Sequence, residues 1–304
     1  MSDRTLSRLN AKFGRGETVR FESGPGGLAV VQVCNAAATA SIALHGGHVL
    51  SWQPSGHEPV LWISSQSRYE AGRAIRGGIP VCWPWFADHP AETGLPAHGI
   101  ARTTTWEVAD AQVLDDSATR LVLRLEDDEH TRAVWPHGFV LELAVTVGRE
   151  LAVELTATSR TDHPLSVTAA LHTYFDVADV RDVSVLGLEG RSYIDKVDAM
   201  DRKVQKGPVR ITGETDRIYL DTLGPCRIED PGRGRVIRVV AEGSHSTVVW
   251  NPWVDKSGVM GDFGDEEYTG MICVETANAG DDVVLLPAGG EHRLKTTLGV
   301  EAIS

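Results

Sequence analysis

Cysteine is scarce in this sequence, and its positions form no motif. The four cysteines stand far apart, without a Cys-x-x-Cys pair, at Cys34, Cys82, Cys226 and Cys273. This spacing argues against a disulfide framework and against a structural zinc site. Buried, reduced thiols are expected for most of them.

Long apolar runs and an excess of positive charge are also missing. No run reaches the roughly 20 residues of a membrane-spanning helix, and the first residues lack the charged-then-apolar pattern of a signal peptide. We therefore expect a cytoplasmic protein without a membrane partner. The 29 lysines and arginines face 42 acidic residues, for a net charge of −13. This balance argues against nucleic acid as a partner, because a phosphate backbone requires a basic surface, but a small phosphorylated ligand needs only a few local cations.

The glycine-rich motifs of nucleotide enzymes and the Gly-x-Ser-x-Gly elbow of serine hydrolases are absent too. Nucleotide cofactors and a serine nucleophile are therefore disfavoured. The 304 residues contain no linker, repeat or low-complexity tract. We expect one domain over residues 1–304, with residues 1–20 as a possible N-terminal extension, and a monomer.

Alternating apolar and polar residues dominate what is present. Period two runs through 121–125, 139–147 and 151–155, which predicts antiparallel strands with one solvated face. Only Leu6, Leu9 and Phe13 show helical spacing, which predicts a short helix over 5–13. Many short strands separated by turn residues favour an all-β fold, a large antiparallel sandwich with few short helices. Further expected strands include 103–108, 165–171, 209–211 and 271–275.

Residues 76–102, here named the 76–102 loop, combine two arginines and a histidine with glycines, prolines and aromatics. Arg76 and Arg102 carry planar guanidinium groups that suit a phosphate or a carboxylate. Trp83, Trp85 and Phe86 offer flat apolar faces. The alternative interpretation is an ordinary long loop with surface arginines.

Several isolated polar residues could carry chemistry. His172 ends an apolar segment and is either a general acid or base or a packed core histidine. Glu275 shares one face of a strand with Cys273 and is either functional or at a solvated strand edge. Asp216 could form an ion pair or contact a sugar hydroxyl. The tryptophans of 250–253 are either platforms for a sugar ring or core residues. His45 and His48 form a weak metal-binding motif. The acidic run 262–267 is interpreted as the solvated start of a helix.

Taken in order, these segments resemble a known family. The sequences Arg76-Gly77-Gly78-Ile79-Pro80, Pro84-Trp85-Phe86 and His98-Gly99-Ile100-Ala101-Arg102 resemble the signature of glucose-6-phosphate 1-epimerases. These hexose-6-phosphate mutarotases are a branch of the aldose 1-epimerase, galactose mutarotase-like superfamily. The segments 171–175, 215–217, 250–253 and 273–275 agree in the same order, so the similarity covers roughly residues 20–300.

The resemblance implies an antiparallel β-supersandwich that binds a small sugar phosphate in a cleft on one sheet. It implies that His172 is the general acid for the ring oxygen and Glu275 the general base for the anomeric hydroxyl. Arg76 and Arg102 match phosphate-binding arginines, and His98 and Asp216 match positions that hold sugar hydroxyls. No metal and no cofactor is expected, because ring opening needs only an acid and a base.

This sequence departs from the family pattern at Ala87, where a glycine is usual, and at Ile100, where a phenylalanine is usual. Both departures concern the shape of the pocket. Two other functions stay open. The first is a mutarotase for unphosphorylated aldoses, but such an enzyme does not need the two arginines. The second is a sugar-phosphate-binding protein without activity, but a binding protein does not need an acid and a base together.

Overall fold

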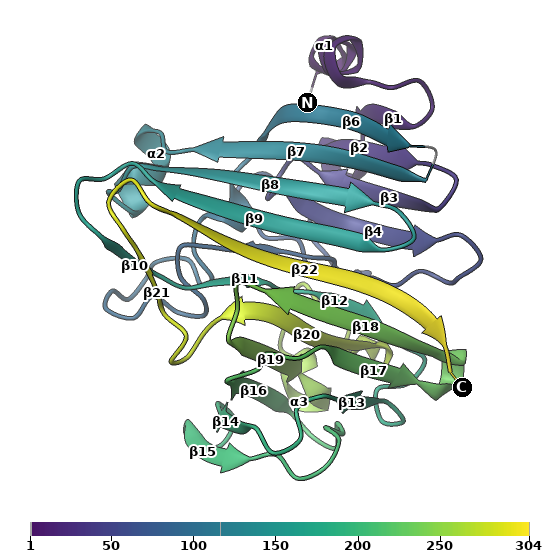
Figure 1. The fold of residues 1–304 in the computed structure, drawn as a ribbon, viewed down its shortest axis with the longest axis vertical. Coiled ribbons are helices and arrows are strands. Elements are labelled where there is room, and N and C mark those ends of the chain that lie inside the picture. Colours follow the sequence, from purple (N-terminus) through teal and green to yellow (C-terminus); the bar gives the residue numbers. More distant parts are fainter. Residues whose placement is uncertain (1, 116, 304) are drawn as a thin grey trace.

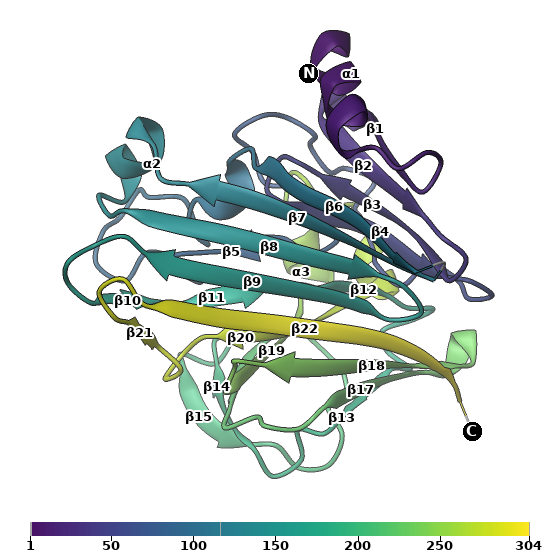
Figure 2. The same cartoon turned by 45° about the horizontal axis from the view of Figure 1, so that its top comes forward.

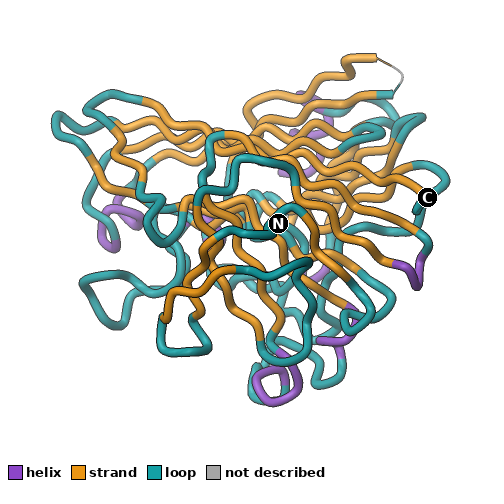
Figure 3. The backbone as a smooth tube through the Cα atoms, turned by 60° about the horizontal axis from the view of Figure 1, so that its bottom comes forward, coloured by secondary structure: helices purple, strands orange, loops and turns teal. Residues whose placement is uncertain are grey.

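Antiparallel strands make up most of the regular secondary structure, as Figure 1 and Figure 3 show for the computed structural model, which describes residues 2–115 and 117–303. The all-β prediction is confirmed. Within these residues the α-helices are short: α1 (Asp3–Phe13), α2 (Glu129–Val134) and α3 (Trp253–Ser257). In the described part of the chain no helix is both long and apolar enough to cross a membrane.

The front sheet in Figure 1 and Figure 2 contains the strands with the clearest period-two pattern. Every neighbouring pair in it is antiparallel. In spatial order its strands are β13 (Ser184–Leu186), β17 (Cys226–Asp230), β18 (Arg235–Glu242), β22 (Glu291–Ala302), β9 (Leu151–Ser159), β8 (Phe139–Val147), β7 (Ala118–Glu126) and β6 (Glu107–Asp115). Along β9 each second residue is buried, which is the pattern of a sheet with one face in the core.

A second sheet, also of eight strands, lies behind the first in Figure 1. Its order is β15 (Asp201–Val204), β14 (Ser192–Asp195), β16 (Thr215–Leu220), β19 (Ser246–Asn251), β20 (Met271–Asn278), β11 (Ala169–Leu171) and β5 (Val81–Cys82), with β12 (Tyr174–Asp176) also paired to β20. Two smaller sheets complete the strands: β1 (Val19–Ser23), β2 (Ala29–Cys34), β3 (Ala38–Ala43) and β4 (His48–Pro54), and the pair β10 (Leu165–Val167) and β21 (Val284–Leu286).

Some local predictions hold and others are wrong. The helix expected over 5–13 is α1, whose Leu6 and Phe13 are buried. Residues 103–108 are not a strand, because the 3₁₀ helix η2 (Ala101–Thr103) comes first and β6 begins only at Glu107. The segment 209–211 is also no strand, since only Val209 bridges to Val185. The expected strand 165–171 is split between two sheets, β10 pairing with β21 and β11 with β5 and β20.

The two faces of β20 have different surroundings. Ile272 and Val274 belong to the main core, which includes inward residues of β7, β8 and β9. Met271 and Cys273, on the alternate positions, belong to a separate apolar cluster with Trp250. Glu275 continues that second face, so the predicted base points away from the main core. The four cysteines form no disulfide; Cys34 is exposed and the other three are buried.

Candidate active site

A pocket of about 300 Å³ lies on this second face of the β20 sheet. Its lining includes most of the residues singled out from the sequence: Arg76, His98, His172, Asp216 and Glu275. They come from different segments and are brought together by the fold. Arg102, the remaining predicted residue, is not among the lining residues. This size lies at the lower end of the range for small-molecule sites.

His172 meets Glu275 because the ladder between two strands is interrupted there. Leu171 pairs with Thr276 and Tyr174 with Cys273, so the two residues between Leu171 and Tyr174 face the stretch of β20 that holds Glu275. His172 Nδ1 lies 3.4 Å from Glu275 Oε1. Both side chains are nearly inaccessible to solvent, at 8% and 1% exposure.

Three polar atoms of this pair have no hydrogen-bond partner. His172 Nδ1 and both carboxylate oxygens of Glu275 are buried without a hydrogen bond. Burial, reinforced by the negative charge of Asp216, raises the pKa of Glu275 well above its ordinary value. Burial, reinforced by Arg102 and Arg76, lowers the pKa of His172 well below its ordinary value. Buried polar groups without partners are rare in folded proteins and mark this pair as a site.

Arg76 lies in the pocket within a frame of two side chains. Its Nε and Nη2 donate to the Asp262 carboxylate at 3.1–3.3 Å, and its Nη1 donates to the Tyr174 hydroxyl at 3.0 Å. Burial opposes the guanidinium charge, but Tyr174 and Asp262 together raise the pKa of Arg76, so it stays charged. The Tyr174 ring in turn stacks on His172, with centroids 4.7 Å apart and planes at 9°. Arg76 and the predicted acid are thus connected through one tyrosine.

The backbone around Arg76 is fixed by buried histidines. His45 Nε2 lies 2.7 Å from the Arg73 carbonyl and His48 Nε2 lies 2.7 Å from the Gly77 carbonyl. Burial lowers the pKa of His48 to about 3, so the ring is neutral and Nε2 is the donor. Gly78 has φ 62°, and a Cβ there would lie 2.3 Å from the Val49 carbonyl oxygen, which requires glycine. The two histidines that formed a weak metal motif are hydrogen-bonded to the backbone on either side of Arg76.

His98 and Arg102 lie at the far end of the 76–102 loop. The Ala87 N–H donates to His98 Nδ1 at 3.2 Å. Burial, reinforced by Arg102, lowers the pKa of His98, so the neutral ring carries its proton on Nε2 and offers a donor. Arg102 Nη2 donates to the Ala97 carbonyl at 2.8 Å, while its buried Nε has no partner. Its role as a phosphate ligand stays a prediction.

Two lysines that the sequence patterns did not reveal also line the pocket. Lys196 Nζ lies 2.8 Å from Asp216 Oδ2, and Lys256 Nζ lies 2.8 Å from Glu214 Oε1. The ion pair left open for Asp216 is therefore formed, with a distant lysine. Each of the three basic side chains that line the pocket, Arg76 included, has a carboxylate partner. A single lysine gives no sequence signal, whether it lies in a turn like Lys196 or in a short helix like Lys256, since only the fold shows which side chain lies nearby.

The aromatic residues divide between pocket and core. Trp250 and Phe86 line the pocket, and the Trp250 ring approaches His172 edge-on at 6.1 Å. Trp83 and Trp85 are buried at 1% and 4% exposure and do not line it. The expected aromatic floor of the 76–102 loop is therefore reduced to Phe86.

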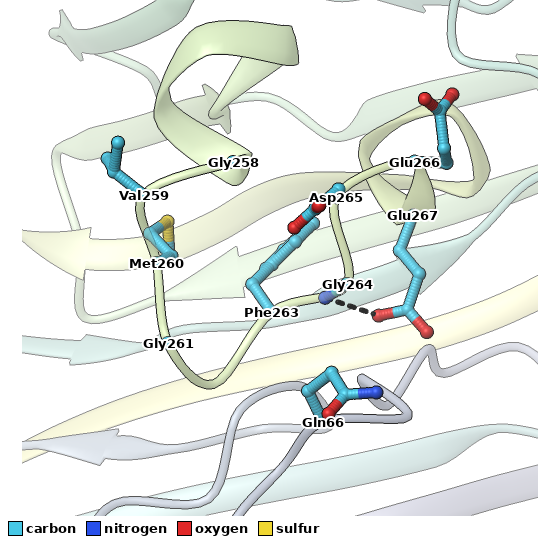
Figure 4. Close-up of a pocket in the computed structure, with 10 residues that line it drawn as sticks. All are labelled: Gln66, Gly258, Val259, Met260, Gly261, Phe263, Gly264, Asp265, Glu266 and Glu267. Atoms are coloured by element: carbon cyan, nitrogen blue, oxygen red, sulfur yellow. Dashed lines mark hydrogen bonds between the residues drawn. The ribbon is translucent and has the colours of Figure 1, made fainter.

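A larger cavity, of about 620 Å³, is lined by residues on either side of Asp262. Figure 4 shows its lining, which consists of Gln66 and residues between Gly258 and Glu267, with the Glu267 carboxylate accepting from the Gly264 N–H. The same carboxylate accepts from Ser64 and Ser65. Its described lining residues include no histidine, lysine or arginine. This cavity lacks an acid–base pair, so the smaller pocket is the candidate active site.

Comparison with known proteins identifies the family of this chain. The family model described as aldose 1-epimerase matches residues 29–299. A Salmonella typhimurium protein assigned as a glucose-6-phosphate 1-epimerase is 42% identical over 241 residues, 79% of this chain and 80% of the relative. An Escherichia coli protein with the same assignment is 41% identical over 243 residues, 80% of each chain.

A solved structure extends the agreement to the fold. The crystal structure of a Salmonella typhimurium protein assigned as a mutarotase superposes with a TM-score of 0.89 at 34% identity, covering 98% of this chain and 99% of the other. The family match covers nearly the whole chain, and the fold match covers both chains. The protein therefore belongs to the aldose 1-epimerase family, enzymes that interconvert the anomers of a sugar.

Proposed function

We propose that this enzyme interconverts the α and β anomers of a hexose 6-phosphate, and that glucose 6-phosphate is its substrate. The observation that carries the proposal is the buried, unpartnered contact between His172 and Glu275 in a pocket lined by three basic side chains. The glucose-6-phosphate 1-epimerase assignment of the Salmonella and Escherichia relatives supports the same substrate.

Ring opening requires two proton transfers. Glu275 as carboxylate takes the proton of the anomeric hydroxyl, and the C1–O1 bond becomes the aldehyde double bond. The bond between C1 and the ring oxygen breaks, its electron pair passes to that oxygen, and His172 as imidazolium donates the proton that it needs. The aldehyde then rotates about the C1–C2 bond. Closure on the other face reverses both transfers and restores the starting protonation.

The electrostatics of the pair fit this cycle. Burial favours a neutral imidazole beside a protonated carboxyl, whereas ring opening starts from imidazolium beside carboxylate. Both forms carry the same number of protons, so transfer of one proton within the pair converts one form into the other. The neutral form is also the form that begins ring closure. The pair therefore passes between its two catalytic forms without net proton exchange with solvent.

The basic residues of the pocket supply the phosphate site. Arg76, Lys196 and Lys256 carry donors that suit a phosphate dianion, and each already has a carboxylate partner that holds it in place. His98 offers a neutral N–H donor for a sugar hydroxyl. Trp250 adds an apolar ring beside the sugar.

Exchange spectroscopy on the anomers of glucose 6-phosphate tests the proposal, with glucose as the control sugar. The expected result is rapid enzyme-dependent α/β exchange of glucose 6-phosphate and a much lower kcat/KM for glucose. Equal kcat/KM values for the two sugars would favour a mutarotase for unphosphorylated aldoses. Saturable binding of glucose 6-phosphate without faster exchange would favour a non-catalytic sugar-phosphate-binding protein.

A further inference from the structure

A third buried side chain lies beside the acid–base pair and takes no part in the proposed chemistry. Cys273 lies on β20 two residues before Glu275, on the same face. Donor atoms of His172, Cys273 and Glu275 all lie within 4.8 Å of one another, and all three residues are buried. Ring opening needs the nitrogen and the carboxylate but has no use for the sulfur.

These three donors are the ligand types that zinc prefers. Zinc binds imidazole nitrogen, thiolate sulfur and carboxylate oxygen in tetrahedral sites. Bond lengths of about 2.0–2.1 Å to nitrogen and oxygen place such donors about 3.3 Å apart in a tetrahedron. The 3.4 Å between His172 Nδ1 and Glu275 Oε1 already matches this spacing. Since the donor atoms lie within 4.8 Å of one another, the sulfur has to approach by no more than about 1.3 Å to complete the set.

The state of the donors also suits a cation. His172 Nδ1 and both Glu275 oxygens are buried without hydrogen bonds, so a metal ion displaces no protein partner from them. Binding of a divalent cation releases the protons of the Cys273 thiol and the Glu275 carboxyl to solvent. The thiolate and carboxylate that result neutralise the charge of the cation, which removes the main cost of burying an ion. His172 and Glu275 line the pocket and Cys273 does not, so an ion that enters through the pocket meets His172 and Glu275 first.

We propose that His172, Cys273 and Glu275 form a binding site for a thiophilic divalent cation of the class of Zn²⁺ and Cd²⁺. A cation bound at this site coordinates both His172 and Glu275 and so blocks their proton transfers. The cation is an inhibitor here and not a cofactor. The binding claim stands on the geometry alone, and only the inhibition claim rests on the proposed function.

Cys82 provides a matched control. It is another fully buried cysteine of the same apolar cluster as Cys273, and burial raises the pKa of its thiol to about 12. It is not a member of the donor group. A cation that reacts with buried thiols in general affects both cysteines, whereas a cation bound at the proposed site depends on Cys273 alone.

The test is a titration with Cd²⁺ in the absence of substrate, followed by the ultraviolet charge-transfer absorption of a cadmium–thiolate bond. Wild type and Cys82→Ala are expected to bind one ion per chain with affinities within about threefold of each other. Cys273→Ala is expected to lose the absorption band and to bind at least about 100-fold more weakly, because removal of an outer-shell partner alone costs 10- to 100-fold. Absence of a saturable band in wild type, or an unchanged band in Cys273→Ala, overturns the proposal.

A second measurement needs no variant. X-ray absorption spectroscopy of the zinc-loaded wild type is expected to show one sulfur neighbour at about 2.3 Å with nitrogen or oxygen neighbours at about 2.0 Å. A spectrum without a sulfur neighbour overturns the site even if Cys273→Ala fails to fold. Zinc is further expected to inhibit anomer exchange in wild type and Cys82→Ala. Because the cadmium and absorption experiments use no sugar, failure of the proposed function leaves their result interpretable.

Discussion

Replacement of Arg76 by glutamine should weaken the use of glucose 6-phosphate much more than the use of glucose. The guanidinium lines the pocket, is 23% exposed and stays charged. Two unit charges 4 Å apart attract by about 4 kcal/mol at an effective dielectric of 20. Solvent and the Asp262 carboxylate reduce this attraction, so the range for hydrogen bonds to charged groups, about 1.5–3 kcal/mol, is the better guide. The expected loss in kcat/KM for glucose 6-phosphate is about 10- to 150-fold.

The single substitution leaves the Asp262 carboxylate without its partner beside the phosphate. A double variant, R76Q/D262N, removes that repulsion and should recover part of the loss. Arg68→Gln is the matched control, because Arg68 donates to the Gly261 carbonyl of the same segment but does not line the pocket. This control should leave kcat/KM for both sugars within about twofold of wild type, since surface changes away from a site have small effects.

Exchange spectroscopy on both sugars gives the comparison directly. We expect kcat/KM for glucose to change by less than about threefold in R76Q, because glucose carries no group for the guanidinium to bind. Equal losses in kcat/KM for the two sugars would show that Arg76 does not act on the phosphate, since they would mean that it binds the sugar ring or stabilises the fold. An unchanged kcat/KM for glucose 6-phosphate would place the phosphate elsewhere.

The kcat for glucose 6-phosphate should show no step from histidine titration at pH 6.5, because burial lowers the pKa of His172 well below that value; a sigmoidal step at that pH contradicts this. Ala87 has a left-handed backbone, with φ 62°, so Ala87→Gly should relieve about 1–2 kcal/mol of strain. Glycine also adds entropy to the unfolded chain, so the net free energy of unfolding, measured in urea, should rise by about 0.5–1 kcal/mol. A lower urea midpoint of unfolding in the variant refutes this prediction. Tyr174→Phe keeps the aromatic ring that stacks on His172 but loses the hydroxyl that accepts a hydrogen bond from Arg76. The KM for glucose 6-phosphate should therefore rise by about 2- to 10-fold with kcat unchanged. A loss confined to kcat argues against the connection between Tyr174 and phosphate binding by Arg76.

The strands with one buried face were predictable, because their apolar residues alternate with polar ones in the same rhythm as the buried positions. In β9 each second side chain is buried, and the sequence alternates accordingly. The strands β14, β15 and β16 were harder to predict, because they are short and take their place from neighbours in the sheet. The 103–108 segment has strand-like residues, but η2 occupies its start through backbone bonds that composition does not encode.

The candidate site shows the same division. His172 and Glu275 were singled out because a titratable residue within an apolar segment is unusual, and the fold brings them to 3.4 Å. Lys196, Lys256 and Asp262 were not singled out as parts of this site, because each lies in a polar stretch and gains its place only through long-range packing. Asp262 stands in an acidic run that looked like a solvated helix start, yet it pairs with Arg76. Local patterns identify unusual residues, whereas partners from distant segments need the fold.

The same limit applies to Ala87. The family pattern places a glycine there, and the sequence alone shows only a small apolar replacement. The structure gives the physical reason for that pattern, since the backbone of Ala87 is left-handed and its N–H donates to His98. The departure therefore affects strain at the pocket edge and leaves the acid–base pair untouched.

We expect the buried His172–Glu275 pair to carry out both proton transfers. The most direct test is the exchange rate of glucose 6-phosphate anomers in Glu275→Gln, His172→Asn and the double variant, at saturating substrate. Each single variant is expected to lose about 10²- to 10⁴-fold in kcat, and the double variant little more than either, because the two groups act as one unit. Exchange at the wild-type rate in either single variant would contradict the account.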